Sequence, residues 1–204
     1  MIQKSGRASV TELANHERHG AQEHHHRGKS SESRLDKARI LQALGLMPGQ
    51  TVLDAGCGNG YMAKEFAARV GQEGKVFALD PDEVAIAALS EQTAGTNIVT
   101  VVGDITAPTV LPAATFDLIY VSNVVHGFST EQLEGFKAEL QRLLAPDGKL
   151  AIVEIVKRDT PFGPPLELRF SPEELQQALA LAGLTTLDVG EGFYLQIFAN
   201  HPST

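Results

Sequence analysis

Short apolar runs alternate with amphipathic segments along most of the chain. An apolar run of about four to eight residues bounded by Gly, Pro, Asn or Asp indicates a buried strand, and apolar residues spaced three and four apart indicate a helix. Strands are therefore predicted at residues 51–55, 75–80, 97–104, 116–123 and 149–156. Helices are predicted at residues 35–44, 61–70, 81–91 and from Ser129 to just before Pro146.

The C-terminal part of the chain follows a different order. Asp147-Gly148 is expected to turn into the fifth strand, and the segment 157–170 is a proline-rich loop. Ser171-Pro172-Glu173-Glu174 has the residues of a helix start, and this helix is expected to end near Gly183. Two final strands, 184–189 and 193–200, are separated by only three residues, which forces them into an antiparallel pair.

This order of elements predicts a Rossmann-like α/β fold. Alternating strands and helices imply a mostly parallel, seven-stranded sheet with an antiparallel C-terminal strand at one edge and helices on both faces. The 204 residues suit one domain, which we expect to span residues 34–204. Ligands of such sheets bind beyond the carboxyl ends of the strands, so the residues that follow each strand are the candidates for function.

Residues 1–33 are polar and lack periodicity, and they hold five of the seven histidines, between His16 and His26. We expect a solvated arm, or a cap over the site that touches the substrate. Histidines so close together have some affinity for transition metals, but the pattern lacks the partners of a well-defined site, so no metal site is assigned.

Composition narrows the classes of function. The net charge is -8, and because residues 1–34 carry +2, the remainder carries -10. An acidic body repels phosphate backbones, which makes a nucleic-acid substrate unlikely. No apolar run is long enough to span a bilayer, no secretory signal precedes the first helix, and a single cysteine forms no internal disulfide. A cytoplasmic location is the expectation, and the oligomeric state is left open.

The strongest chemical signal is VLDAGCGNGY at residues 52–61. A buried strand ends at Asp54 and leads into a glycine-rich turn, after which a helix begins near Tyr61. Glycines let the backbone approach a ligand closely, and the first amides of the helix point at the same place. Asp80 ends the second strand 20 residues after Gly60, where a carboxylate can accept both hydroxyls of a ribose. Together they predict a nucleoside-containing cofactor.

The spacing of the glycines disfavours a nicotinamide dinucleotide. The pattern for that cofactor is Gly-x-Gly-x-x-Gly, whereas here the third glycine comes one place early, at Gly60, and Tyr61 occupies its position. The carboxylate of Asp54 would repel a pyrophosphate but attract a sulfonium or an ammonium group.

At this point the chain resembles the class I S-adenosylmethionine-dependent methyltransferases, and within them the small bacterial UbiE-like, type 11/25 domains. Residues 54–60 resemble the first motif of that family and Asp80 its acidic residue on the second strand. Gly103-Asp104, FDLIYVSNVVH (116–126) and LLAPDGKLAIVE (143–154) resemble later motifs in the same order. The resemblance covers residues 35–200 and implies S-adenosyl-L-methionine as cofactor and methyl transfer to an unidentified, small-molecule acceptor.

The resemblance also implies a set of binding positions. Those around the methionine part, the ribose, the adenine and the sulfonium are Asp54, Gly56, Gly58, Asn59, Gly60, Tyr61, Asp80, Pro81, Asp82, Gly103, Asp104, Ile105 and Ser122. Asn123 and His126, on the exit loop of the fourth strand, are the candidates for alignment or base catalysis. Cys57 is expected to be a small packing residue, and Phe162, Arg169 and Phe170 are candidates for a substrate wall.

Two other functions stay open. One is a nicotinamide-dependent oxidoreductase, which the glycine spacing and the closing hairpin oppose. The other is a non-catalytic, metal-responsive module that uses the histidine-rich arm on the same fold, which the intact glycine turn and acidic pair oppose.

Overall fold

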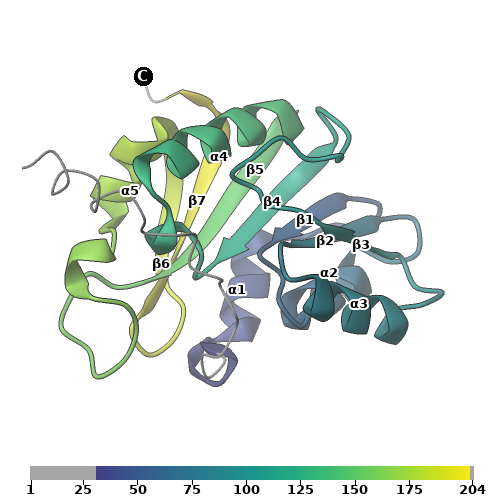
Figure 1. Ribbon diagram of the computed structural model, residues 1–204, viewed down its shortest axis with the longest axis horizontal. Helices are drawn as coiled ribbons and strands as arrows, with labels where there is room; N and C mark the ends of the chain where they lie inside the picture. Colours follow the sequence, from purple (N-terminus) through teal and green to yellow (C-terminus); the bar gives the residue numbers. More distant parts are fainter. Residues whose placement is uncertain (1–30, 203–204) are drawn as a thin grey trace, which may run out of the picture.

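The computed structural model describes residues 31–202, which form one seven-stranded sheet with helices on both faces (Figure 1). The strands are β1 (Thr51–Ala55), β2 (Lys75–Asp80), β3 (Ile98–Val102), β4 (Phe116–Ser122), β5 (Leu144–Ile155), β6 (Leu181–Asp188) and β7 (Phe193–Pro202). The α-helices are α1 (Lys37–Leu44), α2 (Tyr61–Val70), α3 (Glu83–Gln92), α4 (Thr130–Leu143) and α5 (Pro172–Leu179). Three short 3₁₀ helices are η1 (Ser31–Arg34), η2 (Val125–Gly127) and η3 (Leu166–Leu168).

The strand order is β3-β2-β1-β4-β5-β7-β6, and the first five strands in this order run parallel. β7 runs antiparallel to both β5 and β6. The predicted fold class is confirmed. One detail was wrong: the antiparallel strand lies between β5 and β6, and the edge strand is β6.

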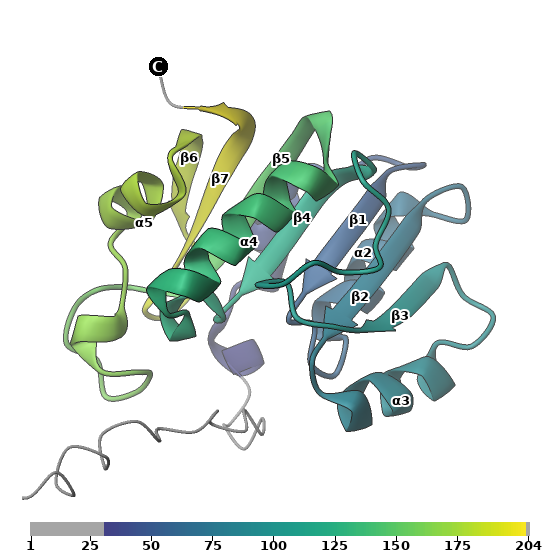
Figure 2. The same ribbon diagram turned by 45° about the horizontal axis from the view of Figure 1, so that its top comes forward.

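Two apolar layers, one on each face of the sheet, form the core. Val52 packs into the layer under α1, α2 and α3, and its neighbour Leu53 packs into the layer under α4 and α5. Figure 2 shows α4 crossing one face while α1 and α2 lie behind the other. Because successive strand residues point to opposite faces, both faces must be apolar, which explains the continuous apolar runs of the central strands. Each fully buried Leu or Phe contributes about 1.5–3 kcal/mol.

Local sequence signals set most helix ends. The side chains of Ser129 and Ser171 accept bonds from the third backbone N–H of α4 and α5, and both capping boxes are complete. Gly71 ends α2, as predicted. Within residues 31–202 no helix has the length and apolar character needed to cross a membrane.

Two predicted boundaries were wrong because strand pairing overrides local turn signals. β5 begins at Leu144, and Asp147-Gly148 lies inside it at an irregularity in its pairing with β4. α5 ends at Leu179, where Ala180 adopts φ +56°, and β6 begins at once. The proposed division into an arm (1–33) and a domain (34–204) stays a prediction, and the histidine-rich stretch lies outside the described residues.

The ion pair of Arg142 and Glu139 on α4 stabilises the loop between β3 and β4 by hydrogen bonds. Arg142 donates to the carbonyl oxygens of Leu111 at 2.8 Å and Thr109 at 3.2 Å, and its Nε donates to Glu139 at 2.8 Å. Glu139 also accepts the Thr109 N–H at 2.9 Å. Burial raises the pKa of the Glu139 carboxyl, but the bonds from Arg142 and Thr109 outweigh it and lower the pKa to about 2.

Replacement Glu139→Gln is therefore expected to lower the free energy of unfolding by about 2–3 kcal/mol at neutral pH, because it leaves a partly buried guanidinium without its charge partner. A depressed carboxyl pKa stabilises the fold above the unfolded value of 4.5, and this contribution is lost as the pH falls toward about 2. Urea titrations across this range check both statements. Glu134→Gln on the same helix, 66% exposed, is the control and should change stability by less than about 0.5 kcal/mol. Equal effects of the two variants would contradict the assignment.

Candidate active site

The candidate site lies where the carboxyl ends of β1, β2 and β4 meet. The order β2-β1-β4 places β1 in the middle, and the connections leave β1 and β4 toward opposite sides, which makes the β1–β4 boundary a topological switch point. Asp54, Asp80 and Ser122 sit at or next to these three ends.

The glycine turn after β1 is bonded to the end of β2. The N–H groups of Gly56 and Cys57 donate to the Leu79 carbonyl oxygen at 2.8 and 3.1 Å, and the Gly58 N–H donates to Asp80 Oδ2 at 2.8 Å. Gly56 has φ +77°, and a Cβ there would lie 2.6 Å from Cγ2 of Val124, which follows β4. Only glycine fits at this position, so the turns after β1 and β4 pack directly together.

The outer side of the same turn is open. A Cβ on Gly58 would meet nothing within 4 Å. Gly60 begins α2 with φ +74° and has no side-chain cap, and the neighbouring Asn59 accepts the Tyr61 N–H at 2.9 Å. Asn59 also donates to Glu32 of η1 at 2.9 Å, which brings η1 to the rim of the turn.

Asp54 is the most unusual group of the site. Its side chain is 3% exposed, and its Oδ2 atom has no hydrogen-bond partner. Burial raises its pKa to about 7, the Ala63 N–H opposes this rise, and the negative charge of Asp80 adds to it. The hydroxyl of Tyr120, which is aligned with Asp54 across β1 and β4, is also buried. An unsatisfied buried carboxylate oxygen is costly, so Asp54 is typical of a place where a ligand supplies a donor.

Asp80 is fully buried and organises the backbone around it. Its Oδ2 accepts the Gly58 N–H, and its Oδ1 accepts the Asp82 N–H at 2.9 Å. Asp82 in turn caps α3, and Pro81 is exposed between them. A carboxylate accepts about four hydrogen bonds, so these two contacts are compatible with the predicted contact to a ribose.

The segment after β3 lies beside β2. The Gly103 N–H donates to the Asp80 carbonyl oxygen at 3.1 Å. Asp104 is exposed and accepts both the N–H and the hydroxyl of Thr106 at 2.8 Å, while Ile105 is buried. The structure thus gathers the residues predicted to contact cofactor along the ends of β1, β2 and β3; their roles stay predictions.

The turn after β4 brings in the remaining candidates. Asn123 adopts φ +58° and donates to Ser122 Oγ at 3.2 Å. His126 follows in η2, with its side chain 21% exposed. Its Nδ1 lies 2.8 Å from Oε2 of Glu154, a 1% exposed residue near the end of β5. Glu154 was not predicted as a site residue, although a carboxylate inside the apolar run LAIVEIV is unusual enough to indicate one.

The proline-rich loop 157–170 is organised by Arg169, which is 6% exposed. Its guanidinium donates to carbonyl oxygens of Pro164, Arg158 and Phe162 at 2.8–3.0 Å. These bonds occupy the side chain, which therefore stabilises the loop. Phe162 stacks on Phe193 with ring centroids 5.9 Å apart, and the Arg34 guanidinium lies over its ring. Arg169 and Phe162, which were predicted as part of a substrate wall, thus make contacts within the protein.

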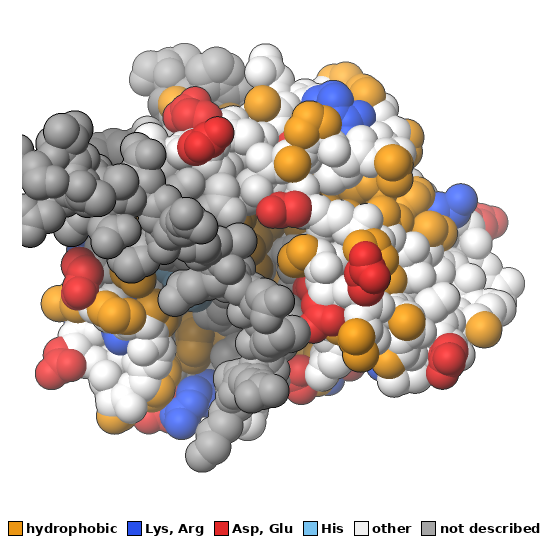
Figure 3. All heavy atoms as spheres, in the orientation of Figure 1, with side chains coloured by type: hydrophobic (Ala, Val, Ile, Leu, Met, Phe, Trp, Pro, Cys, Tyr) orange, Lys and Arg blue, Asp and Glu red, His pale blue; other side chains and the backbone are white. Residues whose placement is uncertain are grey.

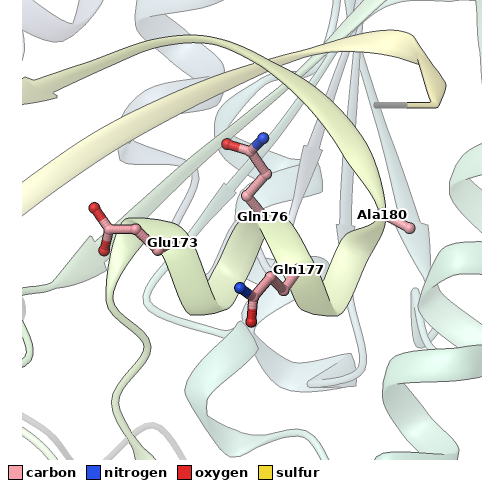
Figure 4. Close-up of a pocket in the computed structure, with 4 residues that line it drawn as sticks. All are labelled: Glu173, Gln176, Gln177 and Ala180. Atoms are coloured by element: carbon pink, nitrogen blue, oxygen red, sulfur yellow. The ribbon is translucent and has the colours of Figure 1, made fainter. Parts of the chain in front are cut away.

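Other features of residues 31–202 add no second chemical site. Burial raises the pKa of the Cys57 thiol, which disfavours the reactive thiolate. No group of three His, Cys, Asp or Glu side chains suited to a metal occurs in this range. A surface depression on α5, of about 340 Å³, is lined by Glu173, Gln176, Gln177 and Ala180 (Figure 4). Three of these residues lie on α5 and Ala180 directly follows it, and Figure 1 shows α5 on the side of the molecule away from β1 and β2.

Comparisons with known proteins agree with this geometry. A family model described as "Methyltransferase domain" matches residues 52–148. The ubiquinone/menaquinone biosynthesis C-methyltransferase UbiE of Hydrogenovibrio crunogenus is 31% identical over 131 residues, which are 63% of this chain and 51% of that protein. The nocamycin O-methyltransferase of Saccharothrix syringae is 33% identical over 117 residues, which are 56% of this chain and 41% of that protein. The chain thus spans about half the length of these curated relatives.

A solved structure extends the likeness to most of the chain. The SAM-dependent methyltransferase from Aquifex aeolicus superposes with a TM-score of 0.73 and 27% identity, over 85% of this chain and 94% of that one. The strand order and the glycine turn after β1 are those of a Rossmann-like α/β domain. By sequence and fold the chain is similar to S-adenosylmethionine-dependent methyltransferases, which agrees with the predicted resemblance.

The described residues fit the cofactor of this family. S-adenosylmethionine carries an ammonium group and a positive sulfur, and the Asp54 oxygen without a partner suits a cation. The open side of Gly58 admits a ligand against the backbone of the turn.

Replacement Asp54→Asn should raise stability and weaken ligand binding at the same time. A carboxyl whose pKa rises from 3.8 to about 7 on folding destabilises the fold increasingly as the pH rises between these values. The amide removes this penalty, so we expect the variant to be more stable by roughly 2 kcal/mol at about pH 8, with a smaller gain at about pH 5. Its affinity for S-adenosylhomocysteine should fall about 10-fold or more.

Thermal unfolding at both pH values and calorimetric titration check this prediction. The matched control is Asp188→Asn on the exposed face of β6. A variant that is less stable than wild type at both pH values, yet binds normally, would show that Asp54 is an ordinary structural residue.

Proposed function

We propose that this protein transfers a methyl group from S-adenosylmethionine to a small-molecule acceptor. The observation that carries the proposal is the buried Asp54 oxygen without a partner, directly behind a glycine turn whose outer side is open. A dinucleotide would bring a negative pyrophosphate to this place, where Asp54 would repel it. The same charge stabilises a cationic ligand.

In the proposed complex, the ends of β1, β2 and β3 each bind a different part of S-adenosylmethionine. Asp54 and the backbone of Gly56, Gly58 and Gly60 would hold the amino-acid part, with Asn59 and Tyr61 at the start of α2. Asp80 would accept the ribose hydroxyls, beside Pro81 and Asp82. Gly103, Asp104 and Ile105 would line the adenine. When bound, S-adenosylmethionine supplies a methyl group already activated by a positive sulfur, so alignment of the acceptor provides much of the rate.

The turn after β4 is the proposed acceptor side. Ser122, Asn123 and His126 follow the strand next to β1, and Val124 between them packs on Gly56. This contact fixes the acceptor side relative to the turn that would hold the cofactor.

A small acceptor is supported by charge and by the relatives. On the face in Figure 3, the Lys and Arg side chains of the described residues are scattered and form no continuous basic patch of the kind that binds nucleic acid. Two relatives are named for ubiquinone and menaquinone biosynthesis and for nocamycin, and these compounds are small molecules. A cytoplasmic location stays a prediction.

The proposal is tested by ligand binding and by transfer of a labelled methyl group. Wild type should bind S-adenosylhomocysteine saturably, and Asp80→Ala should weaken this binding about 10- to 100-fold, because it removes a charged acceptor. Asp188→Ala is the control at an exposed position, and thermal unfolding shows whether Asp80→Ala remains folded. Normal binding in Asp80→Ala, or displacement of the ligand by NADH at similar concentration, would contradict the proposal.

A further inference from the structure

The side chains of His126 and Glu154 form a bonded pair at the end of β5. Glu154 Oε2 lies 2.8 Å from His126 Nδ1, and Glu154 Oε1 accepts the N–H groups of Val125 at 2.9 Å and His126 at 3.3 Å. One carboxylate thus holds both the backbone of η2 and the imidazole ring. With 1% exposure, Glu154 has little room to move.

The surroundings of Glu154 leave the histidine as its main partner. Tyr194 is aligned with Glu154 across β5 and β7, but its hydroxyl donates to the Phe170 carbonyl oxygen at 3.0 Å. Among residues 31–202, no Lys or Arg side chain forms an ion pair with Glu154, and the only cationic candidate in this range is His126. A buried carboxylate in this position favours a proton on Nδ1.

The proton on Nδ1 determines what the other ring nitrogen can do. In a neutral imidazole with Nδ1 protonated, Nε2 carries a lone pair and is a base. No hydrogen bond joins His126 Nε2 to any residue in 31–202, and the His126 side chain is 21% exposed. Because Val124 packs on Gly56, this base lies on the loop that contacts the glycine turn.

We propose that Glu154 is a positioning residue that makes His126 Nε2 a general base, and that the acceptor is a compound whose nucleophile loses a proton in the reaction, such as the hydroxyl of a phenol. This inference rests on the proposed methyl transfer. It specifies the acceptor class, because a nucleophile without an acidic proton, such as a halide, has no use for the pair.

The proposed reaction moves one proton to His126 and one electron pair from the acceptor to the methyl carbon. The acceptor O–H proton moves to His126 Nε2, and the negative charge of Glu154 stabilises the resulting imidazolium. The electron pair left on the acceptor, on oxygen or a conjugated carbon, forms the bond to the methyl carbon. The carbon–sulfur bond breaks, its pair stays on sulfur, and the imidazolium later releases its proton to water. General base catalysis of this kind contributes about 100-fold or more.

If Glu154 only held the backbone of η2, one acceptor oxygen would be enough, and a carboxylate would not be needed. The two backbone N–H groups need one acceptor oxygen, which a glutamine amide would also supply. The variant Glu154→Gln therefore keeps the contacts of Oε1, while its amide NH₂ donates to His126 Nδ1 and drives the ring proton to Nε2. The substitution separates the structural role from the positioning role.

The test is the ring-nitrogen NMR spectrum of the full chain with ¹⁵N-labelled histidine, in which His126→Gln identifies the His126 signals. In wild type the neutral ring should carry its proton on Nδ1, and in Glu154→Gln on Nε2. Glu134→Gln, on exposed α4 surface, should leave the signals unchanged. The positioning role would be overturned if the wild-type ring carried its proton on Nε2, or if the protonated nitrogen were the same in wild type and in Glu154→Gln.

The acceptor class is tested with labelled S-adenosylmethionine on substituted phenols and on iodide. Methylation of phenols that falls about 100-fold in Glu154→Gln supports the class, whereas transfer to iodide alone overturns it. Binding of S-adenosylhomocysteine by the same samples separates the two proposals. If wild type binds none, the proposed function fails; if binding is normal and the tautomer is wrong, only this inference fails.

Discussion

A carboxylate at the end of β2 holds the backbone of the turn that leaves β1, and the site depends on this contact. Asp80 accepts the Gly58 N–H, and the carbonyl oxygen of Leu79 accepts two more N–H groups of the turn. These bonds fix the glycine turn against the sheet, and the start of α2 with it. The segment after β3 then bonds to the Asp80 backbone, and Val124 after β4 closes on Gly56.

The site contains a group that weakens the fold. The buried Asp54 carboxylate has no hydrogen-bond partner at Oδ2, and burial raises its pKa to about 7. Elsewhere the charged groups are satisfied: Arg169 is bonded to loop carbonyl oxygens, and Glu139 is paired with Arg142. Binding sites are expected at such incomplete places, because the ligand supplies the missing partner.

Local rules predicted much of the fold. The strands 51–55 and 75–80, the helix 61–70 and both capping boxes follow from patterns within a few residues. The position of β7 inside the sheet and the start of β5 at Leu144 depend on pairing between distant strands, which no local pattern contains. The glycine turn and Asp80 were found because their spacing has a chemical meaning. The pairing of His126 with Glu154, 28 residues apart, needed the structure.

The central claim is that the Asp54 oxygen and the turn 56–60 receive the amino-acid part of an adenosyl ligand. A crystal structure of the full chain with S-adenosylhomocysteine tests it most directly. We expect the ligand ammonium to lie within hydrogen-bond distance of the Asp54 side chain, directly or through one water, with the ribose at Asp80. A ligand bound elsewhere, with Asp54 Oδ2 still lacking a partner, would contradict it.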